Sequence, residues 1–512
     1  MQRGLLQESL VAAASSAPGR HAVVDEFGRQ TYAEFLDQAM RFARLLQDEG
    51  FQRGDRVALY LDNTAQCAAA VFGTLLAGGV FLVINPQTKA EKLCFVLADS
   101  GASFLVAEGH SASAAAEAVS QRPGVRVFAT RLTPGAAAFQ QLEQALDATD
   151  PAPASPGTSP ADLAALVYTS GTTGSPKGVM LSHQALVFVI GSIAEYLRLD
   201  ADDRILSILP LAYTYGLSQL LLGVRVGGTL LLERTFAFPA RTLERMQAEA
   251  ATVFAAVPTV YATLIGMTHP RPYDSIRCLT NAAAALPPAL HDGIQRLFPN
   301  ARLYRMYGQT ECVRVSYLDP DLLASRPTSV GRAIPGTEAF VLNDDGQPVA
   351  PGETGMLYVR GPHLMTGYWG DPGLTAERLR GGHDGGERIL CTKDHFTVDE
   401  DGLLYFVGRI DDIVKTRGEK VSTVEVENVL HALAGVKQAA VVGVPDELLG
   451  EAVRAYVVLD GSAALTQEDI LRFARTKLEN FMVPREVVIV DELPHTESGK
   501  VRKRSLLEDA PV

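Results

Sequence analysis

The sequence predicts an α/β protein in which a large layered N-terminal body is joined by a hinge to a small C-terminal α+β domain. A length of 512 residues is enough for two or more domains with large cores. Residues 1 to about 147 alternate helical patterns with short apolar strands, which is typical of α/β layers. After Arg409 the pattern changes to a compact module of about 100 residues.

In the N-terminal body, Arg56–Tyr60 and Ser103–Ala107 have the composition of buried strands. The apolar run from Ala68 to Ile84 is nearly long enough to span a bilayer, but Gly78 and Gly79 divide it. We therefore predict a buried helix followed by a buried strand, and no membrane span. The Pro-rich stretch 149–160 indicates a surface loop or linker.

The C-terminal module begins after the polar pair Asp411-Asp412. Ser422 and Glu425 form the pattern of a capping box opening a helix. Its apolar face comprises Val426, Val429, Leu430 and Leu433, with Gly435 at its end. Strands at 439–443 and 455–459, a helix at 466–479 and a strand at 487–490 are predicted to follow. We predict two domains, 1–409 and 410–512.

The composition excludes several function classes. A net charge of −13 argues against a nucleic-acid partner, which favours a basic face. The five cysteines include no CxxC pair, so neither a disulfide framework nor a zinc site is indicated. The first residues lack an apolar segment of signal-peptide length, and we expect a cytoplasmic protein.

The most informative stretch is 168–178, which we interpret as a phosphate-binding loop that follows the buried strand 163–168. It supplies glycines that let the backbone approach a ligand, hydroxyl donors and a mobile cation. These are Gly171, Gly174 and Gly178; Thr169, Ser170, Thr172 and Thr173; and Lys177. A flexible polar loop is the alternative. Pro176 before Lys177 breaks the Walker spacing, which argues against a P-loop NTPase.

Four further motifs follow in order. Tyr307-Gly308-Gln309-Thr310-Glu311 comes after the strand-like run 302–306 and places a carboxylate where Mg²⁺ beside a triphosphate needs one. A helix N-cap is the alternative interpretation. Asp394, Arg409 and Lys500 stand in the other three motifs, 392–394, 408–412 and 494–500. Each motif alone is weak, because a turn residue or a surface cation explains it equally well.

Together, the order and separation of the five motifs resemble the adenylate-forming superfamily of acyl- and aryl-CoA synthetases, peptide-synthetase adenylation domains and luciferases. The resemblance covers nearly the whole chain and implies a β-barrel subdomain within the large body. It also implies an enzyme that uses ATP and Mg²⁺ to convert a carboxylic acid to an acyl-adenylate.

The resemblance assigns roles residue by residue. Residues 170–177 hold the ATP phosphates, Thr310 the α-phosphate and Glu311 the Mg²⁺. Asp394 accepts the ribose hydroxyls, Arg409 reaches the ribose or a phosphate, and Lys500 is the adenylation lysine. Thr169, Ala283, Tyr307 and Gly308 complete the nucleotide site, Asp411 falls at the hinge, and Gly418 lines the pantetheine tunnel.

Two departures from the family pattern concern the nucleotide site. Lys393 replaces a glycine in the 392–394 motif, so it either faces solvent or adds a cation near the ribose. The segment Asn281, Ala282, Ala283, Ala284 and Ala285 replaces a Gly-Gly-Ala-Pro-like run. We expect its small side chains to leave room in the acid pocket and the loss of glycine to restrict backbone approach to the adenine.

The segment 210–217 occupies one side of the family's acid pocket. Amino-acid-activating relatives place an aspartate there to pair with the α-ammonium group, because a buried unpaired cation is costly. This chain has Tyr213 and Tyr215 instead. We therefore expect an aryl, cyclic or medium aliphatic acid rather than an α-amino acid. Core packing is the alternative role for the two tyrosines.

The acyl acceptor is open on sequence alone. No carrier domain follows Lys500, so the acceptor is expected to be separate: CoA, a free-standing carrier protein or an amine, as in amide ligases of the coronafacate-ligase type. CoA is the first expectation because it is the commonest acceptor of stand-alone members. A non-catalytic nucleotide-binding protein is the remote alternative.

Overall fold

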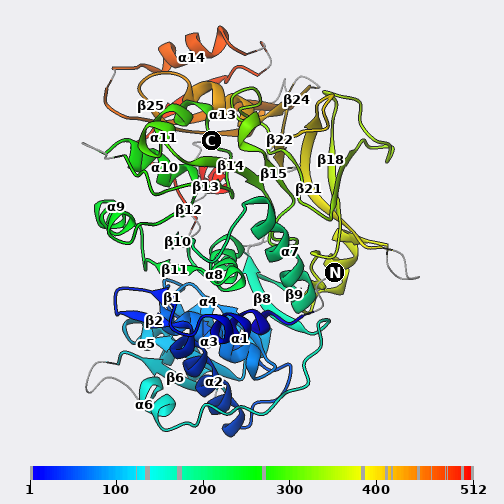
Figure 1. The fold of residues 1–512 in the computed structure, drawn as a ribbon. Coiled ribbons are helices and arrows are strands. Elements are labelled where there is room, and N and C mark those ends of the chain that lie inside the picture. Colours follow the sequence, from blue (N-terminus) through cyan, green and yellow to red (C-terminus); the bar gives the residue numbers. More distant parts are fainter. Residues whose placement is uncertain are drawn as a thin grey trace.

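The computed structural model describes residues 4–122, 124–132, 139–169, 176–267, 272–381, 387–409, 413–416, 419–446, 450–462, 464–478, 480, 482–496 and 501–508. Figure 1 shows the N-terminal third of the chain, in blue and cyan, at the bottom of the molecule. The green and yellow parts lie in the middle, and the orange C-terminal part lies at the top.

The bottom layer is an eight-stranded sheet in the order β19-β9-β8-β4-β3-β5-β6-β7. Its strands are β3 (Arg56–Tyr60), β4 (Val80–Val83), β5 (Phe104–Glu108), β6 (Arg126–Thr130), β7 (Gln140–Gln141), β8 (Leu163–Thr169), β9 (Lys177–Ser182) and β19 (Gly367–Tyr368). The associated helices are α1 (Leu6–Ser16), α2 (Tyr32–Asp48), α3 (Ala65–Leu76), α4 (Ala90–Ser100), η1 (Gly109–Ser111), α5 (Ala112–Ser120) and α6 (Leu142–Asp147). Strands β8 and β9 pair antiparallel, so the predicted phosphate loop joins two neighbouring strands.

The middle layer is a nine-stranded sheet in the order β16-β15-β14-β13-β12-β10-β11-β1-β2. Its strands are β1 (His21–Val24), β2 (Arg29–Thr31), β10 (Arg204–Ser207), β11 (Thr229–Leu232), β12 (Val253–Ala256), β13 (Cys278–Asn281), β14 (Arg302–Tyr307), β15 (Ser316–Leu318) and β16 (Arg332–Ala333). The helices are α7 (His183–Tyr196), α8 (Thr214–Val226), α9 (Pro239–Ala248), α10 (Pro258–Ile265), η2 (Pro288–Leu290), α11 (His291–Leu297) and η3 (Pro320–Leu322). Strands β10 to β14 run parallel, which brings their carboxyl ends to one edge.

A five-stranded antiparallel half-barrel completes the large domain. It consists of β17 (Glu338–Leu342), β18 (Thr354–Arg360), β20 (Leu379–Arg380), β21 (Ile389–Val398) and β22 (Leu404–Arg409), with α12 (Pro372–Arg378) beside it. Asp394 on β21 lies opposite Arg409 on β22. The barrel-like sheet thus brings two separate motifs of the sequence together.

The small C-terminal domain has its own sheet, in the order β24-β23-β26-β25 with β27 paired to β26. Its elements are β23 (Ile413–Thr416), β24 (Glu419–Ser422), α13 (Thr423–His431), β25 (Val436–Asp446), β26 (Gly450–Leu459), α14 (Gln467–Arg475), β27 (Glu486–Ile489) and α15 (Lys503–Glu508). Its apolar residues form two clusters that contain no residue of the large domain. The fold class predicted from the sequence is confirmed.

Local sequence signals explain where several helices begin. Thr31 caps α2 and forms a reciprocal capping box with Glu34. Ser422 accepts a hydrogen bond from the Glu425 amide at the start of α13. That helix ends at His431. The predicted terminator Gly435 therefore lies beyond its end.

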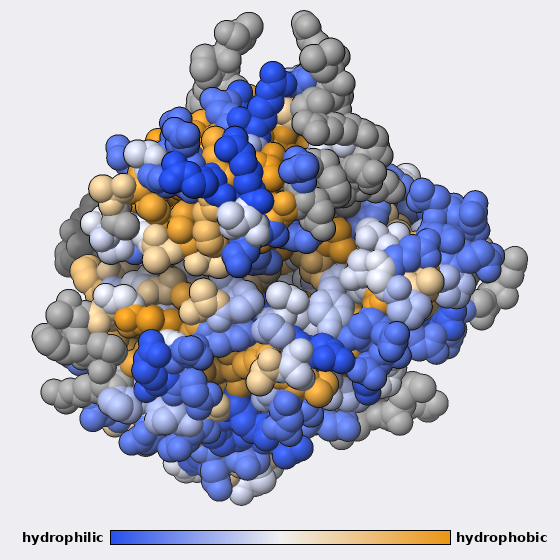
Figure 2. All heavy atoms as spheres, turned by 90° about the horizontal axis from the view of Figure 1, so that it is seen from above, coloured by the Kyte–Doolittle hydropathy of each residue, from blue (hydrophilic) through white to orange (hydrophobic). Residues whose placement is uncertain are grey.

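The apolar run from Ala68 to Ile84 divides as predicted. Its first part lies in α3 and its second part contains β4. Across the described residues, no helix is both long and apolar enough to cross a membrane. The face seen from above carries mainly hydrophilic side chains toward its edges, with apolar ones gathered around a furrow (Figure 2).

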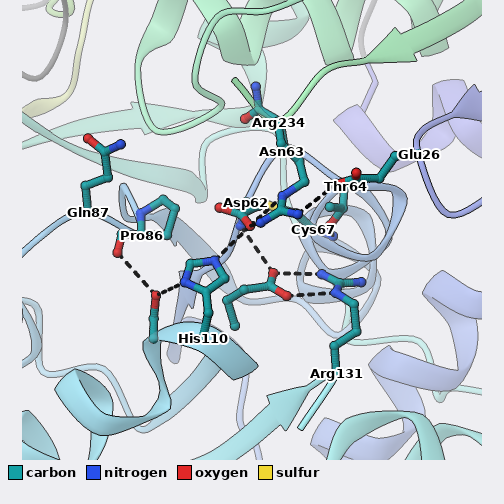
Figure 3. A network of polar contacts seen from close by, with 12 residues as sticks. Glu26, Asp62, Asn63, Thr64, Cys67, Pro86, Gln87, His110, Arg131 and Arg234 are labelled. Atoms are coloured by element: carbon teal, nitrogen blue, oxygen red, sulfur yellow. Dashed lines mark hydrogen bonds and ion pairs between the residues drawn. The ribbon is translucent and has the colours of Figure 1, made fainter. Parts of the chain in front are cut away.

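A polar network joins the two large sheets. Asn63 donates to the carbonyls of Leu209 and Glu233 at 2.9 and 3.2 Å and accepts from the Leu211 amide at 3.0 Å. Beside it, Asp62 lies between His110 and Arg234 (Figure 3). These contacts fix the backbone that leads into the predicted acid pocket.

Candidate active site

Every predicted site residue within the described part of the chain lines one cavity of about 3520 Å³. These residues are Thr169, Lys177, Tyr213, Tyr215, Asn281, Ala282, Ala283, Tyr307, Gly308, Thr310, Glu311, Asp394 and Arg409. They come from both large sheets and the half-barrel. Residues of the small domain, including Ser422 and Lys437, line the same cavity.

Eight predicted residues lie outside the described residues. They are Ser170, Gly171, Thr172, Thr173, Gly174, Asp411, Gly418 and Lys500. The described ends of the segments that carry them flank the cavity: Thr169 and Lys177 bracket the phosphate loop, and Thr496 and Val501 bracket Lys500. Their predicted roles stay predictions.

Asp394 is a buried carboxylate held by groups from three segments. Gln309 donates to its Oδ2 atom at 2.7 Å, and Tyr307 donates to the same oxygen. The Nε atom of Arg409 lies 3.3 Å from Oδ1. Burial, and then the Asp394 carboxylate, raises the pKa of Tyr307 well above its usual value, so its hydroxyl stays protonated and donates.

Lys393, beside Asp394, pairs with a carboxylate. Its Nζ atom lies 2.8 Å from Glu377 Oε1, and both residues line the cavity. Its backbone takes φ of 61°, the left-handed region that glycine favours. Lys393 therefore adopts the backbone conformation that the family's glycine would adopt. Its charge is paired with Glu377.

Glu311 is positioned by a tyrosine and an arginine. Tyr368 donates to its Oε1 atom at 2.6 Å, and Arg378 Nη2 lies 3.7 Å from the same oxygen. Burial first, and then Glu311, raises the pKa of Tyr368, so the phenol remains a donor. Tyr368 and Arg378 both engage Oε1, so Oε2 is the oxygen left to face a cation.

The carboxylate of Glu311 fits a Mg²⁺ ion that is bound mainly by the nucleotide. No group of three or more His, Cys, Asp or Glu side chains suited to a metal occurs among the described residues. Mg²⁺ in nucleotide sites is commonly held by one or two carboxylates plus phosphate oxygens and water. A single carboxylate such as Glu311 is therefore compatible with a nucleotide-bound ion.

The turn from Gly308 to Val313 is too tight for a side chain at its start. A Cβ on Gly308 would lie 2.5 Å from the Val313 carbonyl oxygen and 2.9 Å from Arg314 Cα. Val313 itself takes φ of 61°. No helix follows Tyr307 before β15, so the N-cap alternative for this motif is wrong.

The segment 281–285 begins with Asn281, the last residue of β13, and continues as four alanines at the carboxyl edge of the sheet. Ala283 takes φ of 71°, so this backbone also adopts the conformation that glycine favours. Asn281 is buried, and its Nδ2 atom makes no hydrogen bond within the described residues. Opposite it on β14, the buried Arg305 has its pKa lowered to about 10 by burial.

The residues predicted to line the acid pocket lie where α8 begins. Gly216 is required there, because a Cβ would lie 2.2 Å from the Pro210 carbonyl oxygen. Tyr215 projects from this first turn, and its hydroxyl lies 2.7 Å from Thr280 Oγ1. Tyr213 is the N-cap residue and also lines the cavity.

Several cavity residues were missed by reasoning from the sequence. Tyr368 and Arg378 orient Glu311, and Arg378 also donates to Gln309 and to the carbonyls of Cys391 and Thr392. Arg314 lies against the Tyr215 ring. Gln309 was inside a quoted motif, but Tyr368 and Arg378 carry no local signal and reach the site only through the fold.

Comparisons with known proteins agree with this architecture. The chain matches the AMP-binding enzyme family over residues 10–369 and the AMP-binding enzyme C-terminal domain over residues 425–500. It is 34% identical to a feruloyl-CoA synthase from Amycolatopsis sp over 481 residues, which cover 92% of each protein.

Two solved structures are similar over almost the full chain. ATP-bound MatB from Rhodopseudomonas palustris superposes with a TM-score of 0.90 at 30% identity, covering 99% of each chain. The amide bond synthetase McbA from Marinactinospora thermotolerans gives a TM-score of 0.88 at 28% identity, also covering 99% of each. The chain therefore belongs to the AMP-binding family of adenylate-forming enzymes and is an ATP-binding, AMP-forming ligase of the acyl-CoA ligase type.

Proposed function

We propose that this enzyme activates an aryl, cyclic or medium aliphatic carboxylic acid and transfers the acyl group to CoA. The observation that carries the proposal is the convergence of the predicted nucleotide residues and the tyrosine-lined acid pocket on one cavity. Two carboxylates in that cavity, Asp394 and Glu311, are each oriented by side-chain hydrogen-bond donors. Such pre-organisation is what an electrostatically catalysed phosphoryl-group reaction needs.

In the first half-reaction, a carboxylate oxygen of the acid attacks the α-phosphorus of ATP. The new bond is carboxyl oxygen to phosphorus, and the bond from the α-phosphorus to the bridging oxygen breaks, releasing pyrophosphate. Asp394 accepts hydrogen bonds from the ribose, and Thr310 donates to the α-phosphate. Lys177 and Lys500 offset the charge that develops in line during the transfer.

Glu311 would hold Mg²⁺, which when bound would neutralise charge on the phosphates of ATP. Tyr368 and Arg378 fix the carboxylate that carries out this role. Because both partners engage Oε1, Oε2 is the oxygen we assign to the cation.

In the second half-reaction, the thiol of CoA loses its proton to solvent, and the thiolate attacks the acyl carbonyl carbon. The bond from that carbon to the AMP oxygen breaks, and AMP leaves. We propose that the small domain, 410–512, turns about Asp411 relative to 1–409 between the two steps. Gly418 then lines the passage for the pantetheine arm.

The acid class rests on the pocket wall. Tyr213 and Tyr215 present aromatic surface, and residues 282–285 are all alanine. The segment 210–217 contains no acid to pair with an α-ammonium group. A relative that forms feruloyl-CoA, and covers 92% of this chain, supports an acid with an aromatic or similarly extended frame.

An amine acceptor is the second candidate, because the amide bond synthetase McbA shares the fold over 99% of the chain. A free-standing carrier protein is the third. We further predict that the enzyme works in the cytoplasm.

The test is acid-dependent pyrophosphate release across a panel of aryl, cyclic and aliphatic acids. Each active acid is then incubated with CoA, a carrier protein or simple amines, and the products are identified by mass. We expect acyl-CoA with AMP. Amide or acyl-carrier product without acyl-CoA would replace the proposed acceptor, and no pyrophosphate with any acid would refute the activity.

A further inference from the structure

Arg314 is a buried cation in the wall of the active-site cavity. It follows Val313 in the tight turn after Glu311, and only 2% of its surface is exposed. Its Cζ atom lies 5.4 Å from the centroid of the Tyr215 ring. Among the described residues, no carboxylate forms an ion pair with it, and its buried Nε atom makes no hydrogen bond.

The acidic side chains of the large domain that line the cavity are committed elsewhere. Glu311 is held by Tyr368 and Arg378, and Glu377 is paired with Lys393. Asp394 is held by Tyr307, Gln309 and Arg409. These carboxylates are therefore not the partners of Arg314.

The favourable free energy of the contact with the Tyr215 ring is smaller than the desolvation cost of burying the guanidinium group. A cation over an aromatic face contributes about 0.5–2 kcal/mol. The effective penalty for desolvating an ion in a protein is several kcal/mol. Buried charges are normally paired, so a site with an unpaired arginine is completed by a ligand that carries the acceptor.

The position of Arg314 indicates which ligand that is. Tyr215 belongs to the wall assigned to the acid, whereas Asp394 and Glu311 mark the side assigned to nucleotide and metal. The planar fork of arginine matches a carboxylate, with two parallel hydrogen bonds. An apolar acid would leave the guanidinium group buried and unpaired in the complex.

We propose that Arg314 binds a second carboxylate of the acid substrate, so that the preferred substrate is a dicarboxylic acid whose other carboxylate is adenylated. This inference rests on the proposed function and narrows its substrate class. The apolar frame of the acid still packs against Tyr215 and the alanines 282–285. Arg314 then determines specificity at the end of the acid opposite the carboxylate that is adenylated.

The experiment compares matched acids that differ by one carboxylate: hexanoate with adipate, and 3-phenylpropanoate with 3-(4-carboxyphenyl)propanoate. The kcat/KM for pyrophosphate release is measured for the wild type, Arg314→Met and Arg314→Lys. Arg305→Met is the control, since Arg305 is also a buried arginine that lines the cavity.

We expect the wild type to favour the dicarboxylic member of at least one pair by roughly 10- to 100-fold, the scale of a hydrogen bond to a charged group. Arg314→Met removes that preference and leaves the monocarboxylic acid unchanged or improved, and Arg314→Lys retains part of it. Arg305→Met changes both members of a pair by the same factor. An unaltered ratio in Arg314→Met, or equal loss of both acids, would overturn the assignment.

Calorimetric binding of the dicarboxylic acids without ATP separates this inference from the proposed function. Binding that depends on Arg314, with no pyrophosphate from any acid, would leave the subsite standing and refute the activity. Turnover of both members of each pair with no dependence on Arg314 would support the activity and refute the subsite. If neither dicarboxylic acid binds and neither is turned over, the result counts against the subsite. Thermal melts check that each variant folds, and Arg314→Gln replaces Arg314→Met if the latter does not.

Discussion

At the scale of single residues, two non-glycine residues of the site adopt the left-handed backbone conformation that glycine favours. Ala283 and Lys393 both take positive φ, at 71° and 61°. A left-handed conformation costs an L-residue about 1–2 kcal/mol. The departures noted in the sequence therefore change the side chains at these two points but leave the backbone path intact.

This strain predicts that Ala283→Gly stabilises the protein by roughly 1 kcal/mol, because glycine adopts positive φ without a steric penalty. Thermal or denaturant unfolding measures the change. Ala282→Gly is the matched control: Ala282 is buried, but its φ is not positive, so glycine there should destabilise. A loss of stability in Ala283→Gly would show that the strain is not significant.

Glu311→Gln is predicted to raise the Mg²⁺ concentration needed for half-maximal pyrophosphate release by at least ~10-fold, because a hard cation prefers an ionised carboxylate. Tyr368 can still donate to the amide oxygen, so the fold should hold. Tyr368→Phe should give a smaller shift in the same direction. An unchanged Mg²⁺ requirement in Glu311→Gln would remove this residue from the metal site.

At the scale of elements, the sequence predicts strands and helices well where apolar runs are bounded by turn residues. The strand β8, the division between α3 and β4, and the cap of α13 at Ser422 were all predicted from local signals. Helix ends were less accurate: the helix predicted over 466–479 runs from Gln467 to Arg475. End positions depend on tertiary packing, which spacing along the chain does not specify.

Residues that act through the fold escaped prediction. Arg378 sits in the last turn of α12, and only the pairing of β20 with β21 brings it to Gln309, Thr392 and Glu311. No signal in the sequence singles out Arg314, yet the turn after Gly308 buries it. The five motifs were predictable because their chemistry is local; their supporting residues were not.

The hinge that we propose at Asp411 predicts a separation of the two half-reactions in Asp411→Pro. Proline fixes φ near −65° and removes a backbone donor, so a residue that must alternate between two conformations is held near one of them. We expect adenylation to persist and acyl transfer to fail, measured as single-turnover rates of each step. Asp411→Ala, which keeps φ free, should perform both. Equal rates of both steps in Asp411→Pro would mean that the small domain does not turn at this residue.

At the scale of the whole molecule, buried histidines make stability depend on pH. Burial lowers the pKa of His363 to about 4, and the Arg314 carbonyl opposes this more weakly. The folded state thus resists a proton that the unfolded state accepts near pH 6.5. The stabilisation is complete above pH 6.5 and is lost as the pH falls toward 4.

For His363 alone, the loss from pH 7.5 to pH 5 is about 2 kcal/mol, because one pKa unit corresponds to about 1.4 kcal/mol. His363→Met should therefore lose less stability than the wild type over that interval. Melting temperatures of both proteins at the two pH values measure the difference. Parallel losses in wild type and variant would show that His363 does not titrate between the folded and unfolded states.

The central claim is that the acid carboxylate attacks the α-phosphorus of ATP, and transfer of ¹⁸O tests it most directly. The enzyme is given its preferred acid labelled with ¹⁸O in the reacting carboxylate, together with ATP and CoA, and the nucleotide product is analysed by mass. The account predicts AMP that carries one ¹⁸O atom, with unlabelled pyrophosphate. ADP with labelled phosphate, or AMP without ¹⁸O, would contradict it.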